Sequence, residues 1–148
     1  MFRPTRILVP TDFSEYSDKA LRQALDIAKQ HNALVYVLHV IHEAMHRCWT
    51  DYCLSDEQMQ DFKKQMRVGA EEDLRKQVAK LPEAKGVEVV TDVKEGVPYE
   101  EILREEKERG IDLIVIGTLG RTGITKYFLG SVTKNVAKGA KCPVLLAK

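Results

Sequence analysis

The chain is poor in cysteine, and its charges nearly cancel. Three cysteines in 148 residues form an odd set without a dense framework, which argues against a disulfide-stapled secreted fold and favours a reducing cytoplasm. With 23 basic and 22 acidic residues, the formal net charge is +1. Proteins that bind duplex nucleic acid carry a much broader positive field, so we expect no nucleic-acid partner.

Long apolar runs are missing as well. The longest, at 33–38, is far too short to span a bilayer, and the N-terminus lacks the apolar core of a signal peptide. We therefore expect a cytoplasmic protein with no membrane partner. A chain of this length suits one domain over residues 1–148, with a core that needs no disulfide or metal.

Strand-like and helical patterns alternate along the whole chain. Buried-strand composition occurs at 6–9, 33–41, 87–93, 111–116 and 144–147, and helical spacing of apolar residues at 17–30, 55–81, 98–109 and 131–138. We expect Pro10 to stop the first strand, and the apolar stripe of 55–81, with its Met and Phe residues, to pack in the core. Strands that alternate with helices require crossover connections and a parallel sheet covered on both faces. The sequence predicts an α/β fold, a single doubly wound domain around a five-stranded parallel sheet.

The segment after the fourth expected strand is rich in glycine. Gly117 and Gly120 are followed, after nine further residues, by Gly130 and Ser131, where a helix is expected to begin. Glycine lets backbone N–H groups approach an anion, and a helix start directs unpaired N–H groups and a positive dipole end at it. This pattern predicts a phosphate-binding loop that holds a nucleotide.

Two common nucleotide motifs do not match. Gly123 is followed by Ile124 and Thr125, where a Walker loop would have lysine and a hydroxyl residue. The dinucleotide fingerprint would follow the first strand, where Pro10-Thr11-Asp12 stands instead. Glycines after a strand can also merely turn the chain, and Gly-Ser can be an ordinary helix cap. The nucleotide hypothesis is favoured because two such loops would meet at the carboxyl edge of a parallel sheet.

Four segments together resemble the universal stress proteins across essentially the whole chain. They are 7–14, Leu38-His39-Val40, the glycine pattern of 117–131, and 142–146. The intact glycine pattern is typical of the family's ATP-binding branch. The resemblance implies the strand order 3-2-1-4-5, an adenine nucleotide (ATP, ADP or AMP) with Mg²⁺ at the carboxyl edge, and a homodimer through the strand Val144 to Ala147.

The resemblance also implies individual ligand contacts. Asp12 would contact the metal, Pro10 and Thr11 would flank the ribose and metal, and the backbone of Val40 would contact adenine. The residues expected to hold ribose and phosphates are Gly117, Gly120, Gly130, Ser131, Val132 and Thr133. The residue types agree, because Ser131 and Thr133 offer hydroxyls. Asp12 could instead form a local Asx turn before the first helix.

Other reactive side chains are interpreted structurally. His42, His46, Cys48 and Cys53 match no standard zinc spacing, and we expect them in a flap near the pocket or a partner. We expect His39 to be a packed, hydrogen-bonded histidine and no catalytic residue.

The leading hypothesis is an ATP-binding stress-response regulator, a homodimeric nucleotide-dependent sensor with unknown protein partners. At most it would hydrolyse ATP slowly or phosphorylate itself, because no general base is evident. Three alternatives stay open: a small ATP-consuming phosphotransferase, an interaction protein without nucleotide, and a flavin carrier.

Overall fold

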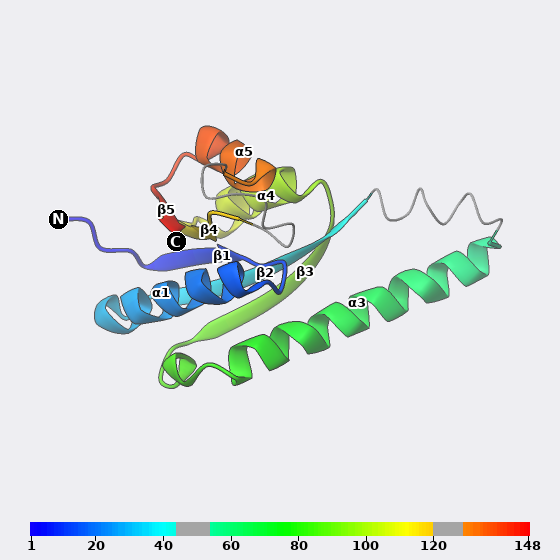
Figure 1. The fold of residues 1–148 in the computed structure, drawn as a ribbon, viewed down its shortest axis with the longest axis horizontal. Helices are drawn as coiled ribbons and strands as arrows, with labels where there is room; N and C mark the ends of the chain where they lie inside the picture. Colours follow the sequence, from blue (N-terminus) through cyan, green and yellow to red (C-terminus); the bar gives the residue numbers. More distant parts are fainter. Residues whose placement is uncertain (44–53, 120–128) are drawn as a thin grey trace.

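Five parallel strands form one sheet in the order β3-β2-β1-β4-β5 (Figure 1). The computed structural model describes residues 1–43, 54–119 and 129–148. The α/β fold and the strand order are therefore confirmed. The strands are β1 (Arg6–Pro10), β2 (Leu34–His42), β3 (Val89–Gly96), β4 (Leu113–Gly117) and β5 (Val144–Ala147).

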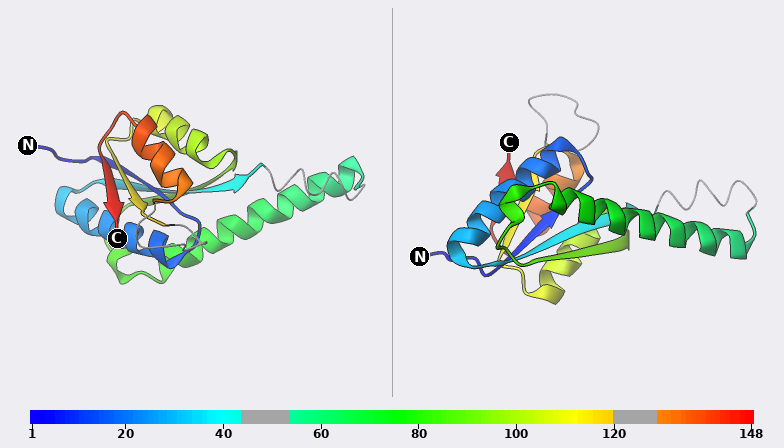
Figure 2. Two further views of the ribbon diagram at one scale, coloured as in Figure 1. Left: turned by 45° about the horizontal axis from the view of Figure 1, so that its top comes forward. Right: turned by 90° about the horizontal axis from the view of Figure 1, so that it is seen from below.

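Helices cover both faces of the sheet (Figure 2). One core cluster joins the sheet to α1 and α3, and a second joins its other face to α4 and α5. Successive strand residues alternate between the two clusters, as the pleat requires: Ile7 belongs to the first and Leu8 to the second. The helices are α1 (Glu15–His31), α3 (Asp56–Ala79), α4 (Pro98–Arg109) and α5 (Ser131–Gly139), with a short 3₁₀ helix η1 (Pro82–Ala84).

Some helix and strand ends differ from the expected ones by up to three residues, and two of these differences have local reasons. Helix α1 begins two residues before the expected Ser17, because the Ser14 side chain caps it by accepting the Ser17 N–H. Strand β1 includes Pro10, which was expected to stop it. The N–H of Thr11 donates to the Leu38 carbonyl at 2.9 Å, so the pairing with β2 continues past the proline.

The long helix α3 extends beyond the rest of the molecule (Figure 1). Ala70 and Leu74 are buried in the core, whereas Met59 and Phe62 are only half-buried and belong to neither core cluster of the described residues. The expectation that the whole apolar stripe packs in the core was therefore wrong for its first turns. A helix of 24 residues is about 36 Å long, whereas the eight residues of β3 extend about 26 Å.

A buried glutamate holds α4 against the sheet. Glu105 is 1% exposed and pairs with Lys94 Nζ of β3 at 2.9 Å and with Arg109 Nε at 3.1 Å. The hydrogen bond to Glu105 raises the pKa of Lys94 above its usual value. A buried carboxylate is tolerated only when it is paired, so these two cations are required for α4 to pack here.

The next residue of α4, Glu106, fixes the segment before β5. Its Oε1 accepts the backbone N–H groups of Lys141 and Cys142, both at 2.8 Å. Burial, followed by the hydrogen bond to Glu106, raises the pKa of the Cys142 thiol to about 12. The thiol therefore stays protonated at neutral pH and is no nucleophile. Over the described ranges, no helix has the length and apolar character needed to cross a membrane.

The interior strand β4 offers a direct test of the core. Ile114 is completely buried in the α4 and α5 cluster, so we expect Ile114→Ala to lower the free energy of unfolding by about 2–5 kcal/mol. Val68 on α3 is 51% exposed, and Val68→Ala should change stability by less than about 0.5 kcal/mol. Urea denaturation followed by circular dichroism measures both, and equal stabilities would contradict this core assignment.

Candidate functional site

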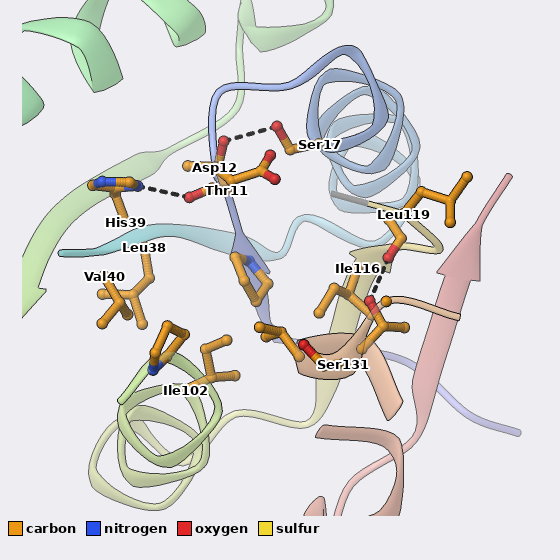
Figure 3. A pocket seen from close by; sticks show the side chains of 16 residues that line it. Thr11, Asp12, Ser17, Leu38, His39, Val40, Ile102, Ile116, Leu119 and Ser131 are labelled. Carbon is orange, nitrogen blue, oxygen red and sulfur yellow. Dashed lines mark hydrogen bonds between the residues drawn. The ribbon is translucent and has the colours of Figure 1, made fainter. Parts of the chain in front are cut away.

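A pocket of about 280 Å³ opens at the carboxyl ends of β1, β2 and β4 (Figure 3). Strand β1 pairs with β2 along its whole length, from Arg6 to Pro10, but with β4 only at Ile7 and Leu8. Strands β1 and β4 therefore stop pairing before their carboxyl ends, and the pocket lies where they part. This is the topological switch point of the sheet, where ligands bind in open α/β folds.

The structure brings together nine of the ten predicted ligand residues. Gly120 lies outside the described residues, and the contact of the other nine with a nucleotide stays a prediction. The nine that line the pocket are Pro10, Thr11, Asp12, Val40, Gly117, Gly130, Ser131, Val132 and Thr133.

The start of α5 forms the electropositive side of the pocket. Its first helical hydrogen bond runs from Lys134 N–H to the Gly130 carbonyl, so the three preceding N–H groups, at 131–133, have no acceptor within the helix. Gly130 is the N-cap and has no side chain with which to cap them. The first turns of α1, α3 and α4 each carry two acidic residues, whereas that of α5 carries none. The positive end of α5 is therefore available to an anion in the pocket.

Two of the residues expected to bind ribose and phosphates also have a structural role. The buried Thr133 hydroxyl donates a hydrogen bond to the Gly117 carbonyl at 2.7 Å, and this bond links α5 to the end of β4. A Cβ atom on Gly117 would lie 3.0 Å from the Tyr16 carbonyl oxygen and 3.2 Å from Tyr16 Cβ. Glycine is thus favoured at this position because β4 approaches α1 closely and any Cβ atom would crowd Tyr16, whether or not a phosphate binds.

The loop between β1 and α1 forms another wall of the pocket. The Asp12 carboxylate accepts the Ser14 N–H at 3.0 Å, which is the Asx turn that the sequence left open. Phe13 has φ 65°, a left-handed conformation that is costly for a bulky side chain. The Thr11 hydroxyl, expected beside the ribose, instead contacts Ser17 Oγ at 3.0 Å and Gln77 Oε1 at 2.9 Å.

His39 is hydrogen-bonded, as expected, but it also lines the pocket. It contacts the Thr11 carbonyl through Nδ1 at 2.8 Å (Figure 3), and its ring centroid lies 4.5 Å from that of Phe13. A carbonyl can only accept, so Nδ1 carries the hydrogen. The strand register explains this position, because Pro10 at the end of β1 pairs with Leu38, the residue before His39.

The opposite wall of the pocket is apolar and was largely missed by the sequence analysis. Ile102 and Pro98 are four residues apart on the first turns of α4, and Ile116 is the last residue but one of β4. The spacing along α4 places both residues on one face, but nothing in the sequence indicates that this face lines a pocket. Together with Leu38 and Val40, they form a surface suited to a flat aromatic ring.

Within the described parts of the chain, no group of three or more histidine, cysteine or acidic residues could hold a metal. His42 is exposed at the end of β2, while His46, Cys48 and Cys53 lie outside the described residues. Asp12 is the acidic residue that lines the pocket. It can supply one carboxylate to a cation that takes its other ligands from phosphate and water.

This sheet order and this site define a doubly wound α/β protein with a pocket at its switch point. The model of the Universal stress protein family matches residues 4–148. The chain therefore belongs to the universal stress protein family.

Individual relatives agree with the family. Universal stress protein MJ0531 of Methanocaldococcus jannaschii is 36% identical over 97% of this chain and 81% of its own length. The solved structure of MJ0577, from the same organism, matches with a TM-score of 0.81 and 31% identity, over 97% of this chain and 95% of that one. The Archaeoglobus fulgidus universal stress protein in complex with dAMP shares the fold, with a TM-score of 0.57 and 24% identity over 99% and 98% of the two chains.

The packing role of Gly117 can be tested by substitution. We expect Gly117→Ala to lower the free energy of unfolding by about 1–3 kcal/mol without any ligand, because the new Cβ atom overpacks against Tyr16. The matched control is Gly69→Ala, since Gly69 lies within α3 with open space around its Cβ position. That change should stabilise the protein by about 0.5–1 kcal/mol. Thermal unfolding compares the two, and a Gly117→Ala protein as stable as wild type would contradict the packing role.

Proposed function

We propose that the pocket binds an adenine nucleotide, with ATP as the principal ligand. The observation that carries this proposal is the start of α5, where N–H groups without a side-chain cap and without an acidic residue in the same turn adjoin the pocket at the switch point. An anionic group is the ligand that such a helix end stabilises. A nucleotide also accounts for the apolar wall, which a free phosphate would leave unused.

The two walls imply an orientation for the nucleotide. The base would lie against Val40 and Ile102, and the phosphates would accept the N–H groups of Ser131 and Val132. The ribose would then lie near the loop that carries Asp12. The A. fulgidus protein of this fold is solved with dAMP, so adenine nucleotides are the first ligands to test.

Asp12 fits a role in binding Mg²⁺. One of its carboxylate oxygens accepts the Ser14 N–H, and a carboxylate has further lone pairs for a cation. Mg²⁺ usually binds one or two carboxylates together with phosphate oxygens and water. The metal would neutralise phosphate charge that the helix end alone leaves uncompensated.

The protein would then act as a nucleotide-dependent regulator of the stress response in the cytoplasm, with at most slow ATP hydrolysis. His39 Nδ1 donates to the Thr11 carbonyl, so His39 could act as a general acid through this nitrogen only by breaking a hydrogen bond that orders the pocket. Ser131 is exposed at the helix start and is the first candidate for autophosphorylation. A phosphotransferase would instead release ADP only when its second substrate is present.

The glycine at the N-cap of α5 allows the nucleotide site to be tested. We expect Gly130→Val to weaken ATP binding by more than about tenfold, because a branched side chain would stand where the phosphate approaches the helix end. The measurement is calorimetric titration of ATP with Mg²⁺ into protein stripped of bound nucleotide, after the released nucleotide has been identified by mass. Gly69→Val, in open space on α3, should bind like wild type.

A Gly130→Val protein that keeps its circular dichroism spectrum and loses ATP binding would support the proposal. Folded wild-type protein that neither releases a nucleotide nor binds ATP would overturn it. That result would favour an interaction protein without a nucleotide.

We also propose that the protein is a homodimer through β5. This strand is at the edge of the sheet, and Leu145 on it is 37% exposed. An exposed edge strand readily pairs or packs with a second copy.

Leu145→Asp should therefore convert the dimer into a monomer, because a charge would be buried without a partner. Light scattering after size-exclusion chromatography measures the mass. The matched control is Val68→Asp at the exposed site on α3, which should remain dimeric. Wild-type protein that is monomeric at micromolar concentration would contradict the dimer.

A further inference from the structure

We infer that Gln77, on a helix whose residues do not line the pocket, is a positioning residue for the nucleotide loop; this inference rests on the proposed nucleotide site. Gln77 is 4% exposed on the sheet-facing side of α3. Its Oε1 lies 2.9 Å from the hydroxyl of Thr11, which is 6% exposed and lines the pocket. The contact joins residues that are 66 positions apart in the chain.

The orientation of the Gln77 amide is determined by its second partner. Its Nε2 lies 2.7 Å from Asp18 Oδ1, and a carboxylate can only accept, so the amide nitrogen faces Asp18 and the carbonyl faces Thr11. Lys80 Nζ lies 2.7 Å from the other Asp18 oxygen and holds that carboxylate in place. Lys80 and Gln77 thus both donate to Asp18, and the Gln77 carbonyl is left to accept from the buried Thr11 hydroxyl.

This orientation determines what the Thr11 hydroxyl does. The Ser17 hydroxyl donates its hydrogen to the Ser14 carbonyl at 2.7 Å, so towards Thr11 it can only accept. The Thr11 hydroxyl hydrogen is therefore shared between Gln77 Oε1 and Ser17 Oγ. The Thr11 oxygen then accepts the Phe13 N–H at 3.1 Å. Gln77 therefore completes the hydrogen bonds of the residue that anchors the loop.

The loop needs this support because its conformation is unfavourable by itself. Phe13 has φ 65°, and a left-handed conformation is sterically unfavourable for a residue other than glycine. Without Gln77, the buried Thr11 hydroxyl loses an acceptor, and the bond that holds the Phe13 N–H weakens. Asp12, between these two residues, would then lose its position at the pocket.

The primary test is ATP binding by Gln77→Leu, a variant of similar volume that has neither polar atom. We expect its affinity for ATP with Mg²⁺ to fall about tenfold, the effect of losing one buried hydrogen-bonded contact. The matched control is Leu74→Ala, one turn away on α3 and 1% exposed in the core. It should lower overall stability at least as much and leave ATP affinity unchanged.

A double-mutant cycle separates positioning from general destabilisation. If Gln77 acts through Thr11, then Gln77→Leu should cause no further loss of affinity in a Thr11→Val background. Fully additive losses would overturn the inference, as would equal ATP affinities for Gln77→Leu and wild type.

A second measurement does not depend on nucleotide. Hydrogen exchange of the Phe13 amide, followed by NMR in the free protein, should be faster in Gln77→Leu than in wild type and in Leu74→Ala. If wild-type protein binds no ATP, the proposed function fails, and this measurement still decides the role of Gln77. Faster exchange supports positioning of the loop, and unchanged exchange overturns it.

Discussion

The hydrogen bonding of β1 is the constraint on which the rest of the structure depends. It pairs with β2 as far as Pro10, but its pairing with β4 ends at Leu8. The chain continues from β1 to α1 and from β4 to α5, and these two helices lie on opposite faces of the sheet. The pocket between them exists because no backbone hydrogen bond joins these strands at their carboxyl ends, as at other switch points of parallel sheets.

The two walls of the pocket are stabilised differently. On the α5 side, backbone N–H groups remain available because the capping residue is Gly130. On the α1 side, backbone and side-chain groups satisfy one another, and the buried pair of Thr11 and Gln77 links the loop to α3. A ligand would thus meet an anion-binding helix end opposite an ordered loop, and pre-organised polar groups lose little entropy when they bind.

Much of the fold could be predicted from the sequence because the signals are local. Runs such as 113–116 are apolar throughout, as buried parallel strands are, and Ser55 with Gln58 forms the capping box that begins α3. The ends of the elements were less predictable. Capping by Ser14 lengthened α1, and α3 was expected to pack along its whole stripe, although the strands beneath it are too short to cover its first turns.

The sequence by itself determined the alternation of strands and helices, the family, and the two loops at the carboxyl edge, since periodicity and glycine spacing are properties of neighbouring residues. Only the tertiary structure decided what each site residue does. Thr133 bonds to Gly117, and Thr11 bonds to Gln77, which no local pattern connects to the site. A hydroxyl can face a ligand or a buried acceptor equally well, and the choice depends on which distant segment packs beside it.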